Sequence, residues 1–263
     1  MIASLGMYDP RWLRGANDLL WQAIAGRLPA NIAAPAALTR DRPLDAIWTA
    51  PDLLLAQTCG YPLMTRLDAA VVATPVYDAP GSEDGWHRSA LIVRADDRAQ
   101  SLADLSGRRI AMNARDSNTG MNLPRGLIAP FAQDGRFFGE VIDTGAHARS
   151  LCAVIARHAD CAAIDAVTLA LWRDRYRGID RRIRVLAWTE PTPGLPLITA
   201  ANQSAEVIAA LREALADVMI DPALHKARAA LRLTGTVVID RTAYGAVTAI
   251  EQRAIAAGYP QLA

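Results

Sequence analysis

Short apolar runs alternate with longer segments of helical periodicity along most of the chain. The runs predict buried strands at 2–7, 45–49, 69–76, 89–94, 108–113, 140–144, 161–165 and 184–189. Helical spacing predicts helices at 10–27, 51–56, 147–158, 167–172, 203–219, 222–230 and 241–257, and one that begins near residue 117. Strands that alternate with helices indicate an α/β fold, and we expect mostly parallel sheets.

Composition places the chain among globular proteins. Its 263 residues, 52% hydrophobic and 21% charged, suit one large domain or two lobes. The formal net charge is +1, which gives no electrostatic case for nucleic acid or for an anionic membrane surface. No apolar run is long enough to span a bilayer, so we expect neither a nucleic-acid partner nor a membrane span.

Cysteine and histidine usage predicts no metal and no cofactor. The three cysteines are too few and too scattered for a disulfide framework, and no C-x-x-C motif occurs. The four histidines lack metal-ligand spacing. The N-terminus has no basic region followed by a long apolar segment, as a signal peptide would have. The protein is therefore expected to be cytoplasmic if Met1 is native, or to have lost a leader before Met1 was added.

A hydroxyl- and glycine-rich loop, 113–120, lies between a predicted strand and a predicted helix. The first turn of a helix presents unpaired N–H groups and the positive end of the helix dipole. With the hydroxyls of Ser117 and Thr119 added, and with Gly120 allowing close approach of the backbone, the loop predicts an anion site. An ordinary capped helix remains an alternative, and the spacing is not that of a P-loop.

Four further residues are candidate site residues because of their positions. His147 stands at a predicted helix start, where it could donate to an oxyanion or simply cap the helix. Asp165 follows an apolar strand, where it would face a crevice at the sheet end or serve as an N-cap. Tyr61 lies in the turn at 57–62, and Tyr8 ends the first strand. Either tyrosine could instead be a packing residue.

Motifs for catalysis are sparse. The chain has no Gly-x-Ser-x-Gly elbow, no metal triad and no evident carboxylate pair. No spacing supports a nucleophile–base pair of His147 with Ser117 or Cys59. We therefore expect a protein that is not an enzyme.

An ordered set of segments carries a resemblance to a known family. They are 57–62 (QTCGYP), 101–113 (SLADLSGRRIAMN), 116–120 (DSNTG) with Leu123 and Pro124, 145–147 (GAH), 160–165 (DCAAID), and Thr189 with 193–196 (PGLP). Over roughly residues 2–200 the chain resembles the phosphate/phosphite/phosphonate-binding (PhnD-like) proteins of ABC importers. The resemblance implies a type II periplasmic-binding-protein fold, with two α/β lobes, two crossover strands and a ligand cleft between the lobes. Lobe 1 would be 1–88 with 188–263, and lobe 2 would be 89–187.

The same resemblance assigns roles to the candidate residues. Lobe 2 would bind the oxyanion with Ser117, Asn118, Thr119, Gly120 and His147. Tyr8 and Tyr61 would face it from lobe 1. Asp165 matches a position where an acidic residue holds the amine of an aminophosphonate.

The implied function is a monomeric solute-binding protein for a small oxyanion, a phosphonate or a related phosphorus compound. Closure of its lobes on the ligand would serve an ABC permease. Family members are usually periplasmic. Asn118 departs from the family pattern, which is richer in small hydroxyl residues at this position. The alternatives are a cytosolic ligand sensor, or an enzyme or binder of thiamine-precursor type on the same fold, with Cys59 as its candidate reactive residue.

Overall fold

The computed structural model describes residues 1–263 and divides them into two compact units. Unit 1 comprises Met1–Asp78, Glu83–Gly85 and Pro193–Ala243. Unit 2 comprises Ala79–Ser82, Trp86–Thr192 and Tyr244–Ala263. No helix is long and apolar enough to cross a membrane.

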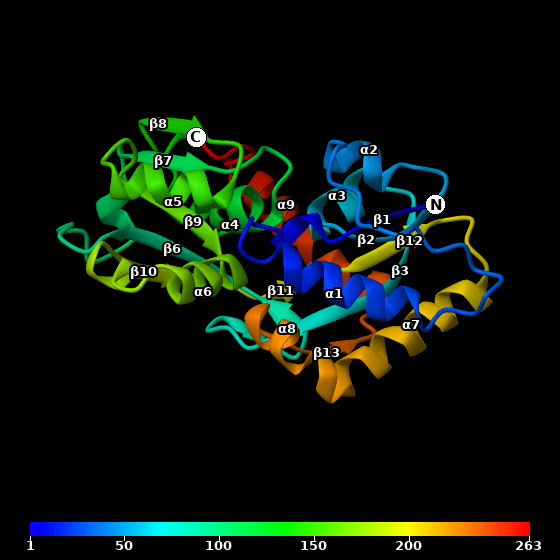
Figure 1. The fold of residues 1–263 in the computed structure, drawn as a ribbon. Coiled ribbons are helices and arrows are strands. Elements are labelled where there is room, and N and C mark those ends of the chain that lie inside the picture. Colours follow the sequence, from blue (N-terminus) through cyan, green and yellow to red (C-terminus); the bar gives the residue numbers. More distant parts are fainter. The chain divides into compact units, whose positions relative to one another are not determined.

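Unit 1 is built on a five-stranded sheet with the order β1-β2-β12-β3-β13. The strands are β1 (Ile2–Ser4), β2 (Leu53–Gln57), β3 (Ala69–Tyr77), β12 (Leu197–Ala200) and β13 (Leu233–Val237). The helices are α1 (Arg14–Ala25), α2 (Leu44–Trp48), α3 (Gly60–Thr65), α7 (Ala205–Ile220) and α8 (His225–Ala230). Helix α1 packs against α7 and α8 (Figure 1).

Unit 2 contains a second five-stranded sheet with the order β10-β6-β9-β7-β8. The strands are β6 (Ser89–Arg94), β7 (Arg109–Met112), β8 (Glu140–Asp143), β9 (Cys161–Asp165) and β10 (Ile183–Trp188). The helices are η3 (Asn118–Asn122, a π-helical turn), α4 (Leu123–Ile128), α5 (His147–Ile155), α6 (Ala166–Arg175) and α9 (Gly245–Ala256). Helix α5 packs on β9 and β7 (Figure 1).

Several short elements complete the chain. Three two-residue strands, β4 (Ser82–Glu83), β5 (Trp86–His87) and β11 (Thr192–Pro193), lie where the chain passes from one unit to the other. The 3-10 turns are η1 (Gly6–Tyr8), η2 (Ala103–Leu105), η4 (Ala129–Phe131), η5 (Ile179–Arg181), η6 (Pro222–Leu224) and η7 (Arg241–Tyr244).

The C-terminal helix α9 belongs to unit 2 because polar contacts hold it there. The Nδ2 group of Asn122 donates to the carbonyl of Val247 at 2.9 Å. Arg125, almost wholly buried, donates to the carbonyl of Pro260 at 2.9 Å and pairs with Glu251. Contact density thus groups 244–263 with unit 2, whereas the expected lobe 1 included this segment. The expected lobes, as bodies that move relative to each other, stay a prediction.

Two expectations about secondary structure are wrong. The sequence pattern predicts a strand at 45–49 and a helix at 51–56, but the chain forms helix α2 and then strand β2. All five residues of β2 are buried, and periodicity cannot separate such a short apolar run from a buried helix. Strands β12 and β13 were not anticipated at all.

The sheets are also not mostly parallel. In unit 1 only β1 and β2 pair in parallel, while β12 and β13 run antiparallel to their neighbours. In unit 2 strand β7 is parallel to β8 and β9, but β6 and β10 pair antiparallel. Simple βαβ units therefore account for only part of each sheet, because other strands enter from distant segments of the chain.

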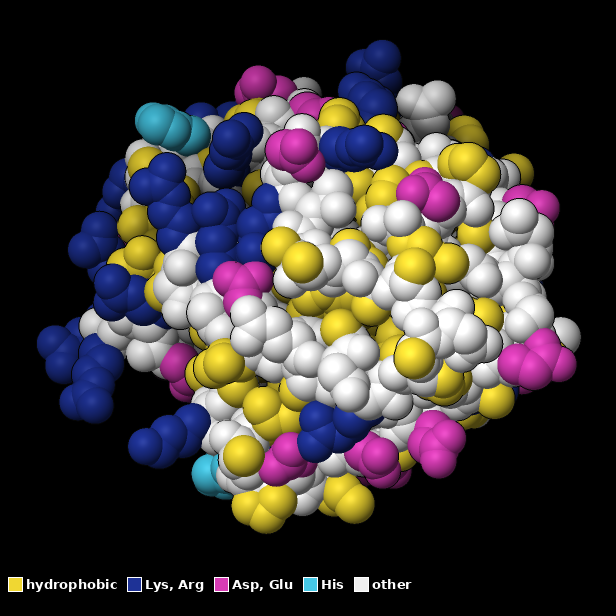
Figure 2. All heavy atoms as spheres, turned by 45° about the vertical axis from the view of Figure 1, so that its right-hand side comes forward, with side chains coloured by type: hydrophobic (Ala, Val, Ile, Leu, Met, Phe, Trp, Pro, Cys, Tyr) yellow, Lys and Arg dark blue, Asp and Glu magenta, His cyan; other side chains and the backbone are white.

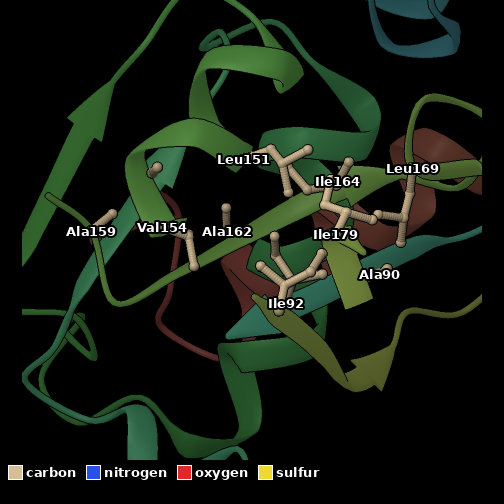
Figure 3. Packing of buried hydrophobic residues seen from close by; sticks show 11 residues of the cluster. Ala90, Ile92, Leu151, Val154, Ala159, Ala162, Ile164, Leu169 and Ile179 are labelled. Carbon is tan, nitrogen blue, oxygen red and sulfur yellow. The ribbon is translucent and has the colours of Figure 1, made fainter. Parts of the chain in front are cut away.

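The core of unit 2 lies between its sheet and the helices on one face. Ala90 and Ile92 of β6 point to the same side as Ala162 and Ile164 of β9, because side chains alternate along a strand (Figure 3). Leu151 of α5 packs onto them and is fully buried. This apolar layer positions both the N-terminus of α5 and the carboxyl end of β9.

Arginine supplies 27 of the 28 basic residues, and much of it binds main-chain carbonyls. Arg228 donates to the carbonyls of Val218 and Asp221 at the end of α7. Arg241 donates to the carbonyls of Leu63, Leu67 and Ala69 in the same way. The planar guanidinium of each arginine thus binds several carbonyl oxygens, among them carbonyls that the end of a helix leaves without a partner.

The charges are balanced in number but not in position. The segment 173–184 carries six arginines and two aspartates, although the whole chain has a formal net charge of only +1. In the space-filling view, Lys and Arg side chains gather toward one side of the visible face (Figure 2).

We predict that Leu151→Ala lowers the free energy of unfolding by about 2–5 kcal/mol, because it leaves a cavity in the core of unit 2. The matched control is Leu19→Ala, on the exposed side of α1, where 54% of the residue is accessible. That change should stay within about 0.5 kcal/mol. Denaturant unfolding measures both, and equal losses would contradict the assigned core.

Candidate functional site

The loop after β7 forms a capped, buried turn. Ser117 takes an extended conformation, and its Oγ accepts a hydrogen bond from the N–H of Gly120 at 2.9 Å. Serine is a favoured N-cap because its oxygen satisfies a donor of the first turn. All five residues of the turn Asn118–Asn122 are buried. The predicted helix start is therefore confirmed, and it opens as a π-helical turn.

Gly120 is required by close approach of two side chains. A Cβ atom at this position would lie 1.7 Å from Oδ1 of Asn113 and 3.1 Å from Cε1 of His147. The amide of Asn113 and the ring of His147 therefore lie directly against the backbone of the turn. Oδ1 of Asn113 is buried without a hydrogen bond. Rotating this amide by 180° would present its NH2 donors instead.

Thr119 and His147 form the central polar contact of unit 2. Their Oγ1 and Nε2 atoms are 2.9 Å apart. The carbonyl of Thr119 accepts a hydrogen bond from Oγ of Ser89 at 2.7 Å. The N–H of Ser89 donates in turn to Oγ1 of Thr189 at 2.9 Å. Ser89 thus joins the turn, 30 residues later in the chain, to Thr189, 100 residues later, through buried hydroxyl groups.

Asn118 has a supporting role in this arrangement. Its Nδ2 group donates to Oγ1 of Thr192 at 2.9 Å, and its Oδ1 accepts from Nδ2 of Asn122 at 3.0 Å. Both ends of the amide are therefore engaged within unit 2. The side chain holds the turn in place, and its backbone contributes to the helix N-terminus.

Asp165 ends β9 and begins α6. Its Oδ1 accepts a hydrogen bond from the N–H of Thr168 at 2.8 Å, so it is the N-cap of that helix. Its Oδ2 lies 3.3 Å from Nδ1 of His87, and both side chains are almost completely buried. Of the two roles weighed for Asp165, the N-cap is confirmed, and the role in a ligand crevice at the sheet end stays a prediction.

The cluster perturbs the ionisation of its members. Burial alone raises the pKa of Asp165, but the hydrogen bond and charge of His87, followed by His147 and the Thr168 N–H, outweigh it and lower the pKa to about 2. Burial lowers the pKa of His147, and the carboxylate of Asp165 opposes this in part. At neutral pH Asp165 is therefore ionised and His147 is neutral.

The two predicted tyrosines belong to unit 1. Tyr8 is buried, with its ring packed edge-to-face on Tyr77 at a centroid distance of 5.2 Å. It lines an apolar cavity of about 40 Å³ together with Gln57. Tyr61 lies half-buried in the first turn of α3.

One residue of the 57–62 motif was not singled out from the sequence. Oγ1 of Thr58 is buried without a hydrogen bond, although its N–H donates to the carbonyl of Pro196 at 2.9 Å. An unpartnered buried hydroxyl in unit 1 is a further candidate contact for a polar ligand.

Unit 2 brings together six of the eight predicted site residues, while the two tyrosines lie in unit 1. The six are Ser117, Asn118, Thr119, Gly120, His147 and Asp165. Sequence reasoning missed His87, Ser89 and Thr189 as members of the cluster. The only available signal was their position beside the ends of predicted strands, where polar side chains meet at a sheet edge.

No group of three or more His, Cys, Asp or Glu side chains is placed to hold a metal ion. Cys59 and Cys161 are buried, and burial raises the pKa of the Cys161 thiol. The chemistry available at the cluster is hydrogen bonding from hydroxyls, backbone N–H groups and an imidazole. Such neutral donors can form hydrogen bonds to an anion.

Comparison with known proteins decides the family. Residues 50–244 match the model of a family described as the periplasmic substrate-binding proteins of phosphonate ABC transporters. The chain belongs to this family. A search of curated proteins found no match.

Solved structures show that the fold is the two-lobed type II periplasmic-binding-protein fold. A binding protein of an ABC phosphonate transporter from Pseudomonas aeruginosa aligns with a TM-score of 0.75 at 16% identity, over 97% of this chain and 86% of that one. PhnD1 from Prochlorococcus marinus, in complex with methylphosphonate, aligns with a TM-score of 0.73 at 12% identity, over 96% of each chain. A protein from Xanthomonas citri bound to ATP aligns with a TM-score of 0.63 at 14% identity, over 97% and 96%.

We predict that Gly120→Ala destabilises the protein by about 1–3 kcal/mol, because the new methyl group must displace the Asn113 amide. Adding Asn113→Ala should recover part of this loss, since it removes the nearest atoms. The matched control is Gly15→Ala in α1, where a Cβ meets nothing within 4 Å. Thermal unfolding of Gly120→Ala, Asn113→Ala, the double variant and Gly15→Ala tests the contact. If the losses in stability of the two single variants simply add in the double variant, the contact is contradicted.

We predict that Asp165→Asn alters the acid limb of the stability curve. A carboxyl whose pKa is lowered in the folded state adds stability above its ordinary pKa, and this is lost as pH falls toward about 2. Asparagine keeps the N-cap but not the charge. Between about pH 5 and about pH 2 the wild type should lose on the order of 2 kcal/mol relative to the variant. Parallel denaturant-unfolding curves over this range would refute the charge effect.

Proposed function

We propose that this protein is the solute-binding component of an ABC importer and that its ligand is a small phosphorus oxyanion of the phosphonate class. Family membership supports the transport role. The methylphosphonate complex of PhnD1, a protein of the same fold, supports the ligand class. In this proposal the protein works in the periplasm, delivers its ligand to a permease and catalyses no reaction.

The observation that carries the proposal is the buried turn 117–120 against His147. A phosphonate is strongly hydrated, so burying it needs several aligned donors to replace its water. The first turn of a helix supplies N–H groups and a positive dipole end for such an anion. Oγ of Ser117, Oγ1 of Thr119 and the imidazole of His147 lie around this same turn.

The remaining predicted contacts take specific places in the proposal. Tyr8 and Tyr61 stay proposed ligand contacts from unit 1. Asp165 was expected to hold a ligand amine, but its Oδ1 caps α6 and its Oδ2 faces His87. We therefore give Asp165 the role of capping α6 and orienting His87.

An enzyme on the same fold is less well supported. Cys59, its candidate nucleophile, is a buried residue at the start of α3 in unit 1. Membership of a family of transporter solute-binding proteins favours binding over nucleophilic chemistry at this residue. The sensor alternative has no observation of its own in its favour.

We predict that the double variant Ser117→Ala/Thr119→Ala binds methylphosphonate at least about 100-fold more weakly than the wild type. Two hydrogen bonds to a charged ligand, each contributing about 1.5–3 kcal/mol, are removed. Isothermal titration calorimetry with methylphosphonate, phosphite and phosphate measures the loss. The matched control is Ser106→Ala/Thr234→Ala, which removes the same two hydroxyl types from exposed positions.

Two outcomes would count against the proposal. If the wild type binds none of the three phosphorus oxyanions, the ligand class is wrong. If it binds one of them and the Ser117→Ala/Thr119→Ala variant binds equally well, the ligand site lies elsewhere.

A further inference from the structure

A buried relay of four side chains starts at the turn 117–120 and leads away from it. Nδ2 of Asn118 donates to Oγ1 of Thr192 at 2.9 Å, and Oδ1 of Asn118 accepts from Nδ2 of Asn122 at 3.0 Å. Oδ1 of Asn122 accepts in turn from Nη2 of Arg125 at 2.5 Å. Thr192, Asn118 and Asn122 are fully buried, and Arg125 is 3% exposed. The four side chains thus form one continuous path of hydrogen bonds inside unit 2.

Two groups fix the direction of every hydrogen bond in the relay. A guanidinium can only donate, so the Asn122 atom that faces Arg125 is the oxygen. Nδ2 of Asn122 then faces Asn118, and it also donates at 2.9 Å to the carbonyl of Val247, which can only accept. Because an NH2 group only donates, the Asn118 atom that it meets is the oxygen, and Nδ2 of Asn118 faces Thr192. Arg125 and Val247 together therefore determine the orientation of both amides.

The C-terminal segment of the chain holds Arg125 in place. Nη1 of Arg125 donates to the carbonyl of Pro260 at 2.9 Å, and its Nη2 lies 3.1 Å from Oε1 of Glu251. Glu251 belongs to α9, which packs against α4, the helix of Arg125 (Figure 1). Nε of Arg125 is buried without a hydrogen bond. Val247, Glu251 and Pro260 all follow residue 244, where the match to the family model ends.

Asn118 is the residue through which the relay reaches the proposed oxyanion site. It is the first residue of the turn and lies between the cap Ser117 and Thr119. Its backbone N–H is one of the groups that the first turn offers to an anion. An amide of Asn118 that rotated freely would lose its hydrogen bond to Thr192 and would let the start of the turn move. Donors that are already held in place need no ordering when the ligand binds, so this preorganisation raises affinity.

We propose that Arg125 is a positioning residue for the oxyanion site and that it acts on Asn118 through Asn122. The inference rests on the proposed function and adds to its site a residue that acts without contacting the ligand. Glu251 compensates the charge of Arg125, so the part of Arg125 is to donate in a fixed direction and not to attract the anion. The C-terminal segment 244–263 thereby contributes to ligand affinity.

Isothermal titration calorimetry of Arg125→Met with methylphosphonate, phosphite and phosphate is the first test. Methionine fills similar space but cannot donate, so Asn122 loses the partner that fixes its oxygen. We expect the affinity to fall by about tenfold, the effect of one lost buried hydrogen bond. The matched control is Arg184→Met, because Arg184 is a partly buried arginine of unit 2 that donates to the carbonyls of Asp97 and Ala99. That control should lose stability but keep the wild-type affinity.

A double-mutant cycle separates positioning from a general loss of stability. If Arg125 acts through Asn118, Arg125→Met should weaken ligand binding in the wild type but have little further effect in Asn118→Ala. Its effect on the free energy of unfolding should persist in both backgrounds, because the contacts with Pro260 and Glu251 are lost in both. Equal effects of Arg125→Met on affinity in the two backgrounds would overturn the inference.

Side-chain NMR of the wild type decides the question if Arg125→Met does not fold. Before any ligand is added, the NH2 groups of Asn118 and Asn122 should exchange with solvent far more slowly than that of the exposed Asn202. Fast exchange that slows only when methylphosphonate binds would overturn the inference, because the ligand rather than Arg125 would then order the turn.

Failure of the proposed function and failure of the inference give different results. If the wild type binds none of methylphosphonate, phosphite and phosphate, the proposed function is contradicted and the inference with it. If the wild type binds one of them and Arg125→Met binds it equally well, the inference alone is contradicted.

Discussion

The hydrogen bond between Oγ1 of Thr119 and Nε2 of His147 is the contact on which the site depends. It ties the turn after β7 to the first residue of α5, at a separation of 2.9 Å between two partly buried side chains. Ser89 extends the contact to β6 by donating to the carbonyl of Thr119. In a medium of low dielectric such bonds reinforce one another, and a polar group left without a partner is costly. The network therefore fixes the turn, and the apolar core beneath α5 fixes the network.

The site gathers neutral donors rather than charged ones. Asn113 and His147 lie so close to the turn that only glycine fits at position 120. Asn118 uses its amide to hold the turn, and Asp165 caps α6 and lies beside His87. Neutral donors of this kind can bind an anion through hydrogen bonds. This agrees with the family of transporter solute-binding proteins to which the chain belongs.

Sequence patterns located the candidate turn because its signals are local. Serine is a favoured residue directly before a helix, and Ser117 accepts a hydrogen bond from the N–H of Gly120 at the predicted helix start. Partner choice within the cluster could not be predicted, because it depends on strand register. Ser89 stands opposite Asp165 in the β6–β9 pairing, and nothing in either local sequence records this. The exchange of helix and strand at 44–57 has a similar cause, since a short apolar run lacks a distinguishing period.

The central claim is that an oxyanion occupies the turn at 117–120. A crystal structure of the protein with methylphosphonate tests it most directly. The account predicts phosphonate oxygens within hydrogen-bond distance of Oγ of Ser117, of Oγ1 of Thr119 and of backbone N–H groups of the turn. His147 should still contact Thr119. A phosphonate bound elsewhere, with Ser117, Thr119 and His147 bonded only to one another, would contradict it.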